Sequence, residues 1–135
     1  MNNEKKLVFM LVVDNDDKFL TTSALQELQF NIRIRFLSDS VELFIALKEQ
    51  RPSVILIDYN LSPEPGVEIL KQLKSDKHYS SIPVVILTES SIWHYHAQCY
   101  SNGASSVIKK PATMQMTAHK INTFFDYWVN VAETP

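Results

Sequence analysis

The sequence contains little cysteine and no long apolar run. Its 135 residues include one cysteine, Cys99, so no disulfide can form within the chain, as is typical of proteins in a reducing cytoplasm. No stretch reaches the ~20 consecutive apolar residues that a membrane-spanning helix needs. The N-terminus lacks the apolar core and the cleavage site of a signal peptide. We therefore expect a soluble, cytoplasmic protein that does not associate with membranes.

Glycine is also scarce, and neither sign of charge dominates. Gly66 and Gly103 are the two glycines, and no glycine-rich nucleotide-binding loop occurs. The formal net charge is −2 and no basic stripe is present, so nothing favours binding to nucleic acid. Apolar residues make up 45% of the chain, enough for one hydrophobic core. We expect residues 1–135 to form a single domain with no output domain.

Apolar runs and segments with helical spacing alternate along the chain. Strands are predicted at residues 7–13, 31–36, 53–57, 82–87 and 104–108. Helices are predicted at residues 16–30, from a cap at Ser38 or Asp39 to about residue 50, and at 67–75, 90–102 and 113–131. This alternation predicts an α/β fold, a doubly wound five-stranded parallel sheet with five helices on its two faces.

Helical spacing also predicts which side chains face the core. The inward positions are Phe19, Leu20, Ala24, Leu25 and Leu28 in the first helix, Val41, Leu43, Phe44 and Leu47 in the second, and Met116, Ile121, Phe124, Phe125, Trp128 and Val131 in the last. Residues 31–36 alternate between apolar and polar side chains, which indicates a half-buried strand near a sheet edge.

Polar residues follow four of the predicted strands. Asp58 ends the central apolar run, and the others are Asp14, Asn15 and Asp16 after the first strand, Thr88 after the fourth and Lys110 after the fifth. Carboxyl ends of parallel strands share one edge of the sheet, so these side chains should converge there. Clustered carboxylates need a cation, and an oxygen-rich site suits Mg²⁺. A carboxylate beside Mg²⁺ can attack phosphorus and form an aspartyl phosphate.

These motifs resemble the receiver domain of two-component response regulators. The matching segments are Val12-Val13-Asp14-Asn15, Ile57-Asp58-Tyr59-Asn60-Leu61, Ile86-Leu87-Thr88-Glu89 and Ile108-Lys109-Lys110-Pro111, with Gly66 eight residues after Asp58 and Gly103-Ala104 before the last strand. The resemblance covers essentially the whole chain and implies a flavodoxin-like, receiver topology. The aromatic C-terminal run from Ile121 to Trp128 is similar to that of single-domain regulators associated with cyanobacterial phytochromes.

The resemblance implies a function and a set of site residues. Asp58 would accept the phosphoryl group, and Thr88 and Lys110 would contact it. The implied Mg²⁺ ligands are Asp14, Asn15, Asp58 and the backbone carbonyl of Asn60. The implied protein is a stand-alone receiver and not an enzyme. It would take its phosphoryl group from a sensor histidine kinase, and it would signal to a downstream protein target or form a homodimer through its fourth and fifth helices.

Three positions depart from the receiver pattern and leave an alternative open. Asn15 is a neutral amide where a second carboxylate is usual, although Asp16 could substitute if the loop shifts by one residue. Val107 replaces the usual aromatic switch residue, and Glu89 follows Thr88 where a small residue is common. A degenerate receiver that binds proteins without phosphorylation would explain all three departures.

An enzyme on a related fold is less consistent with the sequence. Phosphatases of the haloacid-dehalogenase type also use a strand-end aspartate, but they need a second aspartate where this chain has Asn60. Flavodoxin-like electron carriers need a phosphate-binding loop after the first strand, and none is present.

Several other residues have a structural interpretation. His94 and His96 lie two residues apart, so on a helix they point to different faces and should not form a metal site. Cys99 is expected in the core, and Asp17 is expected to interact favourably with the start of the first helix. For the aromatic residues of the fourth helix, Trp93 and Tyr95, core packing and an exposed partner-binding surface both remain open.

Overall fold

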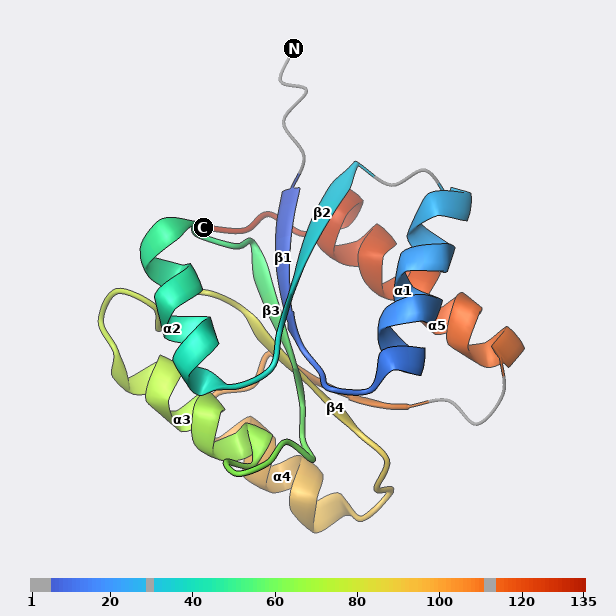
Figure 1. The fold of residues 1–135 in the computed structure, drawn as a ribbon. Helices are drawn as coiled ribbons and strands as arrows, with labels where there is room; N and C mark the ends of the chain where they lie inside the picture. The colour runs from blue at the N-terminus through green and yellow to red at the C-terminus, as the bar shows by residue number, and fades with distance from the viewer. Residues whose placement is uncertain (1–5, 29–30, 111–113) are drawn as a thin grey trace.

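Five parallel strands form one sheet, in the order β2-β1-β3-β4-β5 (Figure 1). The computed structural model describes residues 6–28, 31–110 and 114–135. Its elements are β1 (Lys6–Leu11), α1 (Asn15–Leu28), β2 (Ile32–Leu37), α2 (Ser40–Glu49), β3 (Val54–Asp58), α3 (Gly66–Ser75), β4 (Val84–Thr88), α4 (Trp93–Ser101), β5 (Ser106–Lys109), α5 (Met114–Asp126) and the π-helical turn η1 (Tyr127–Val131). Neighbouring strands are parallel throughout, which confirms the predicted fold class.

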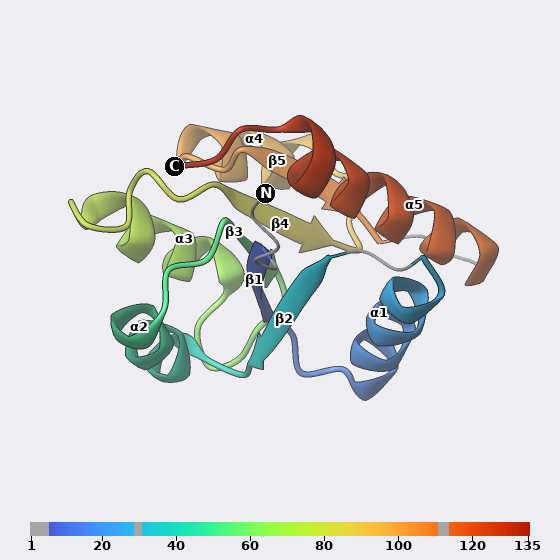
Figure 2. The same ribbon diagram turned by 90° about the horizontal axis from the view of Figure 1, so that it is seen from above.

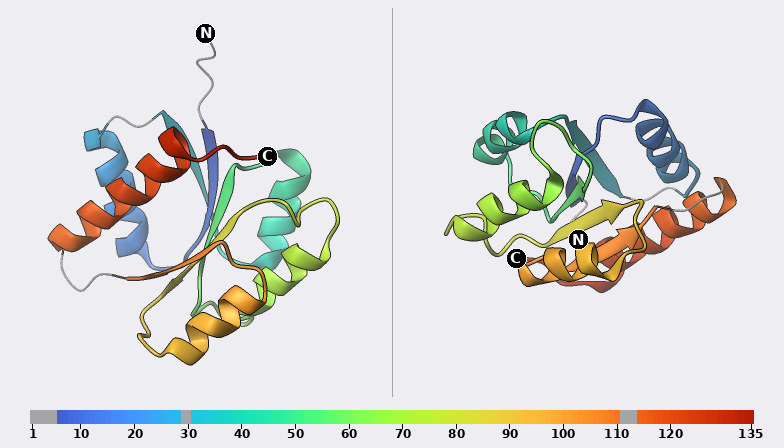
Figure 3. Two further views of the ribbon diagram at one scale, coloured as in Figure 1. Left: turned by 180° about the vertical axis from the view of Figure 1, so that it is seen from behind. Right: turned by 90° about the horizontal axis from the view of Figure 1, so that it is seen from below.

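Helices cover both faces of this sheet. Figures 2 and 3 show α1 and α5 side by side on one face, with α2, α3 and α4 on the other. Successive side chains of β1 supply the two sides, because strand residues alternate between faces. Phe9 and Leu11 join the core under α2 and α3, whereas Val8, Met10 and Val12 join the core that includes α5 residues Phe124 and Phe125.

The helix ends follow the predicted chemistry. The Asp39 carboxylate accepts a hydrogen bond from the Glu42 amide at 2.8 Å and caps α2, which selects Asp39 over Ser38. Gly103 follows α4 with a φ of 101°, a left-handed conformation that suits glycine. Pro83 lies directly before β4, where its missing N–H breaks no ladder hydrogen bond.

Three predicted core positions are wrong. Phe19 in α1, Val41 in α2 and Val131 in η1 leave 69%, 67% and 61% of their surface exposed. In α2 the buried face passes through Leu43, Ala46 and Leu47 instead, so Val41 lies one step to its side. Predictions for Ala24, Leu28 and Met116, and for the ends of the helices at residues 30 and 113, concern side chains or positions outside the described part of the chain.

Some element boundaries also shift. β1 ends at Leu11 and β5 begins at Ser106, each two residues inside its predicted span. α4 begins at Trp93 because side chains hold residues 90–92 in a turn: the Thr88 hydroxyl accepts from the Ser90 amide, and the Ser90 hydroxyl accepts from the Ile92 amide, both at 3.0 Å. Within the described ranges, no helix is both long and apolar enough to cross a bilayer.

Candidate functional site

Asp58 is the last residue of β3, at the carboxyl edge of the sheet. Only 6% of the residue is exposed, and both carboxylate oxygens are bound. Oδ1 accepts from the Asn60 amide at 3.0 Å, and Oδ2 accepts from the Lys110 ammonium at 2.7 Å. The structure therefore brings together two residues 52 positions apart that the sequence assigned to one site.

Lys110 is shared by two carboxylates. Besides Asp58, its ammonium binds Asp17 Oδ2 at 2.9 Å, from the first turn of α1. Burial by itself lowers the pKa of Lys110, but hydrogen bonds and charges from Asp58 and Asp17 outweigh burial and raise the pKa above its ordinary value. The Lys110 backbone amide also donates to the Thr88 carbonyl at 2.8 Å, which fixes the start of this side chain against β4.

Asp17 is the site residue that the sequence did not reveal. Its interpretation as a residue that only favours the start of a helix is incomplete, because its carboxylate contacts Lys110. Asp17 shares a helix face with Leu20 and Thr21, which turn toward the sheet. That spacing was the available signal, but the contact joins residues 93 positions apart and depends on how α1 is placed.

Asp14 caps the start of α1. Asp14 Oδ1 accepts hydrogen bonds from the amides of Asp16 and Asp17 at 2.7 and 3.2 Å. The other carboxylate oxygen, Oδ2, takes no part in these two bonds. Asn15 and Asp16 are exposed in the first turn of the helix. Across the described residues, no three acidic, histidine or cysteine side chains are grouped closely enough to hold a metal by themselves.

Thr88 ends β4 and is 2% exposed. Its hydroxyl oxygen accepts from the Ser90 amide at 3.0 Å, which leaves the hydroxyl proton available to a new acceptor. Glu89, the next residue, is exposed and lies on the rim of a cavity beside Lys109 and Lys110.

Gly66 keeps the loop after β3 tight. Its amide donates to the Tyr59 carbonyl at 2.9 Å. A Cβ atom at this position would lie 2.4 Å from the Asp58 carbonyl oxygen and 3.0 Å from the Tyr59 Cα, both of them backbone atoms. Any residue other than glycine at position 66 would therefore clash with the backbone of Asp58 and displace its carboxylate.

Val107, at the position of the usual aromatic switch residue, contacts a tyrosine of α4. Val107 is half-buried in β5, and its amide donates to the Tyr100 hydroxyl of α4 at 3.1 Å. α4 also contacts the residue after Asp58: the Tyr59 hydroxyl donates to Gln98 Oε1 at 3.2 Å, and the Tyr59 and Tyr95 rings lie 5.7 Å apart.

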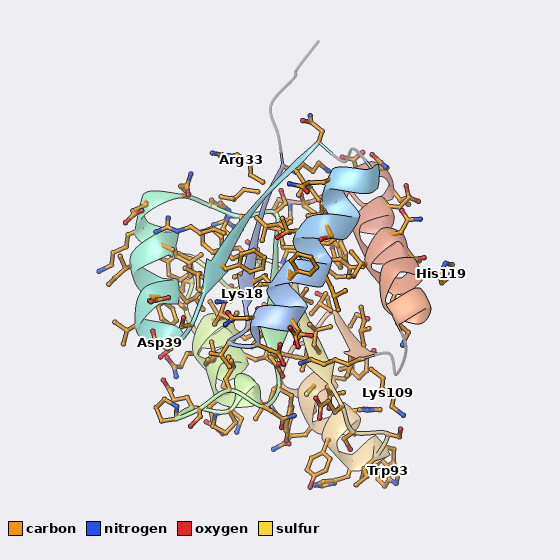
Figure 4. All side chains as sticks on the ribbon, turned by 45° about the vertical axis from the view of Figure 1, so that its right-hand side comes forward. Lys18, Arg33, Asp39, Trp93, Lys109 and His119 are labelled. Carbon is orange, nitrogen blue, oxygen red and sulfur yellow. The ribbon has the colours of Figure 1, made fainter. Side chains whose placement is uncertain are left out.

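The exposure of Trp93, His94, His96 and Cys99 shows which way each side chain of α4 faces. Trp93 is 74% exposed at the outer end of the helix (Figure 4), so core packing is wrong for it. His94 is exposed, and His96 is half-buried with Nε2 2.8 Å from the Ser90 carbonyl oxygen. Cys99 is buried, as predicted.

Comparisons with known proteins agree with this geometry. The family model of the response regulator receiver domain matches residues 10–122. Response regulator Rcp1 of Synechocystis sp. is 26% identical over 113 residues, covering 73% of this chain and 77% of Rcp1. Protein RcaC of Microchaete diplosiphon is 22% identical over 83% of this chain, which spans 17% of RcaC.

Solved structures are similar over nearly the whole chain. The phosphorylated cyanobacterial phytochrome response regulator RcpA superposes with a TM-score of 0.89 at 25% identity, covering 97% of this chain and 99% of RcpA. The Mn²⁺-bound form of Rcp1 shares the fold, with a TM-score of 0.87 at 22% identity over 96% of this chain and 99% of Rcp1. The resemblance to phytochrome-associated regulators is confirmed.

Proposed function

We propose that this chain, which belongs to the response regulator receiver domain family, accepts a phosphoryl group on Asp58. Phosphorylation then changes the surface through which the protein binds its signalling partner. One observation carries the proposal: the nearly buried Asp58 carboxylate ends β3 with the Lys110 ammonium 2.7 Å from Oδ2. A carboxylate so placed can act as a nucleophile, and the lysine supplies positive charge where a phosphoryl group would arrive.

The transfer forms one bond and breaks one. An oxygen of Asp58 attacks phosphorus, and the bond from phosphorus to the donor breaks, with the electron pair leaving on the donor. Lys110 stays fixed by Asp17 on one side while its ammonium contacts the phosphoryl oxygens on the other. The Thr88 hydroxyl donates a hydrogen bond to a phosphoryl oxygen while its oxygen continues to accept from the Ser90 amide.

The donor set around Asp58 fits a divalent cation such as Mg²⁺. The Lys110 ammonium binds two carboxylates, those of Asp17 and Asp58, so these three groups carry one net negative charge. The proposed ligands are the oxygens of Asp14, Asn15, Asp58 and the Asn60 carbonyl, all of the hard type that Mg²⁺ prefers. The cation, when bound, neutralises charge on the phosphoryl oxygens.

We assign the partners by analogy with the family. A sensor histidine kinase supplies the phosphoryl group, the receiver itself is not an enzyme acting on other substrates, and a downstream protein or a second copy binds at α4 and α5. The phosphorylated state of RcpA and the bound Mn²⁺ of Rcp1 support a similar chemistry here. The exposed Trp93 on α4 supports a contact surface on that helix.

Intact mass after incubation with acetyl phosphate and Mg²⁺ tests the assignment. The wild type should gain one phosphoryl mass, and Asp58→Ala should gain none. Asp39→Ala is a matched control, since it removes a carboxylate that caps α2 on the other face of the sheet, and it should still be labelled. Labelling of Asp58→Ala at the wild-type rate would refute the role of Asp58.

A receiver that binds proteins without phosphorylation is the second candidate. It is favoured by the three departures from the receiver pattern, Asn15, Glu89 and Val107. Under this alternative the wild type takes no phosphoryl group and shows no affinity for Mg²⁺ at millimolar concentration. Calorimetric titration with Mg²⁺ beside the mass measurement separates the two candidates.

A further inference from the structure

A cavity of about 420 Å³ lies between the sheet and the helices α1 and α5. Its walls are apolar side chains from all three layers, among them Met10 and Leu56 from the sheet, Leu20 from α1, and Phe124 from α5. Cavities that hold small molecules have volumes of roughly 300–1,000 Å³ and walls of this kind. The volume is thus enough for a small organic molecule.

The α1 wall of the cavity carries a hydroxyl side chain at a buried position. Thr21 lies on this wall and is 3% exposed, and its hydroxyl donates to the Asp17 carbonyl at 2.8 Å, which ties the side chain back to its own helix. Of the other large apolar side chains described in α1, Phe19 points to solvent and Leu25 packs against the core that includes Phe124. Among the described residues, α1 contributes the leucine Leu20 and the threonine Thr21 to the apolar part of this wall.

Two lysines at the mouth of the cavity form no ion pair with a described carboxylate. Among its charged residues, Lys110 is bound by Asp17 and Asp58, and Asp14 caps α1. Lys109 donates to the Ser91 hydroxyl and Lys120 donates to the Lys109 carbonyl, and within the described ranges neither ammonium has a carboxylate within 4 Å. The lining as a whole carries three carboxylates and three lysines, so an anion finds unpaired ammonium groups only locally, at Lys109 and Lys120.

We propose that this cavity binds a small amphiphilic carboxylate, whose aliphatic or aromatic body lies between α1 and α5 and whose carboxylate reaches Lys120 and Lys109. The apolar walls select the body and the uncompensated ammonium groups select the sign of the head group. The proposal goes beyond phosphorylation, because it assigns a ligand to a space that Asp58 does not line.

Titration of the full chain with octanoate, followed by amide chemical shifts, tests the proposal. Saturable shifts are expected for Leu20, Ile108 and Phe124, which line the cavity. Octylamine, with the same tail and the opposite charge, should bind more weakly. Lys120→Gln should weaken octanoate binding about two- to fivefold, in line with a partly exposed ion pair. Lys48→Gln, an exposed lysine on α2, is the matched control and should bind like the wild type.

A variant that fills the cavity provides the second arm. Leu20→Trp should weaken binding on the order of tenfold or more, provided that its amide spectrum stays dispersed. If Leu20→Trp does not fold, Thr21→Leu fills the same wall with a smaller change. Binding of octanoate that is unaltered in a folded filled variant, that does not saturate, or that is equalled by octylamine would overturn the proposal. These readouts do not use Asp58, so they are separate from the test of phosphorylation.

Discussion

The two faces of the sheet are packed in different ways. Under α2 and α3 the core is closed, and the side chains of Leu43, Leu70 and Leu73 have no exposed surface. Between α1 and α5 a cavity of about 420 Å³ opens instead, and the same side carries the pair of Asp17 and Lys110. One face therefore stabilises the fold, and the other combines a weaker packing with the charged groups of the site.

The difference comes from residue choice within the helices. α3 presents Ile69, Leu70 and Leu73 at helical spacing, all within 1% of full burial. α1 presents Asp17, Leu20 and Thr21 at the same spacing, a charged, an apolar and a hydroxyl side chain. A helix whose inner face carries a carboxylate for a distant lysine cannot also fill that space with leucine.

The largest expected effect is the loss of stability when a core leucine is truncated to alanine, and it should differ between the two faces. Leu70→Ala should lower the free energy of unfolding by about 2–5 kcal/mol, because it leaves a void in a closed core. Leu20→Ala, which enlarges a space that is already open, should cost less than about 1.5 kcal/mol, since little new void forms. Urea denaturation of both variants measures the difference, and equal costs would contradict the comparison.

A smaller effect is expected at the glycine where the closed face meets the site. Gly66→Ala forces a Cβ to within 2.4 Å of the Asp58 carbonyl oxygen, so the backbone must move, at about 1–3 kcal/mol. Labelling by acetyl phosphate should slow in parallel, because Asp58 moves with that backbone. Gly103→Ala is the control: its φ of 101° costs stability of about 1–2 kcal/mol, but it lies away from Asp58 and labelling should persist.

The smallest effect concerns the lysines of the two faces, whose pKa values shift in opposite directions. Burial lowers the pKa of Lys74 on α3 below its ordinary value of 10.5, whereas the pKa of Lys110 is raised above the same value by its carboxylates, against burial. Titration of the lysine Cε resonances by NMR should resolve this order. Asp17→Asn should bring the pKa of Lys110 down and leave that of Lys74 unchanged.

The sign of the stability change follows from these directions. The raised pKa of Lys110 means that its contribution to stability is complete below pH 10.5 and is lost as pH rises through the higher folded value. The lowered pKa of Lys74 has the opposite effect on stability. Its buried charge destabilises the folded protein at neutral pH, and this cost disappears as pH rises through the lowered folded pKa toward 10.5. Asp17→Asn should therefore flatten the loss of stability in alkaline solution.

The fold was predictable from the sequence because the strands are buried on both sides. The runs that became β3 and β4 have no polar interruption, and their length excludes a helix of ordinary size. Helix faces were harder to predict: Phe19 and Val41 match the spacing of core residues but lie one step off the buried face. Spacing fixes which residues share a face, but the rotation of the helix is fixed by tertiary packing.

The site was predictable in part for a similar reason. Asp58, Thr88 and Lys110 lie at strand ends, and parallel strands bring their carboxyl ends to one edge. Asp17 lies on a helix, so its contact with Lys110 depends on where α1 begins, and Asp14 decides that by capping it. The apolar cavity has no sequence motif at all, since its lining residues come from separate strands and helices.

The hydrogen bond from the Val107 amide to the Tyr100 hydroxyl has a consequence for self-association. β5 is an outer strand of the sheet, and an unpaired amide on such a strand can template a strand from another molecule. Tyr100 occupies the amide in the middle of β5 with a side chain from the same chain. A strand from another molecule could pair with this part of β5 only by displacing Tyr100, so the hydrogen bond acts against continued strand pairing at this edge.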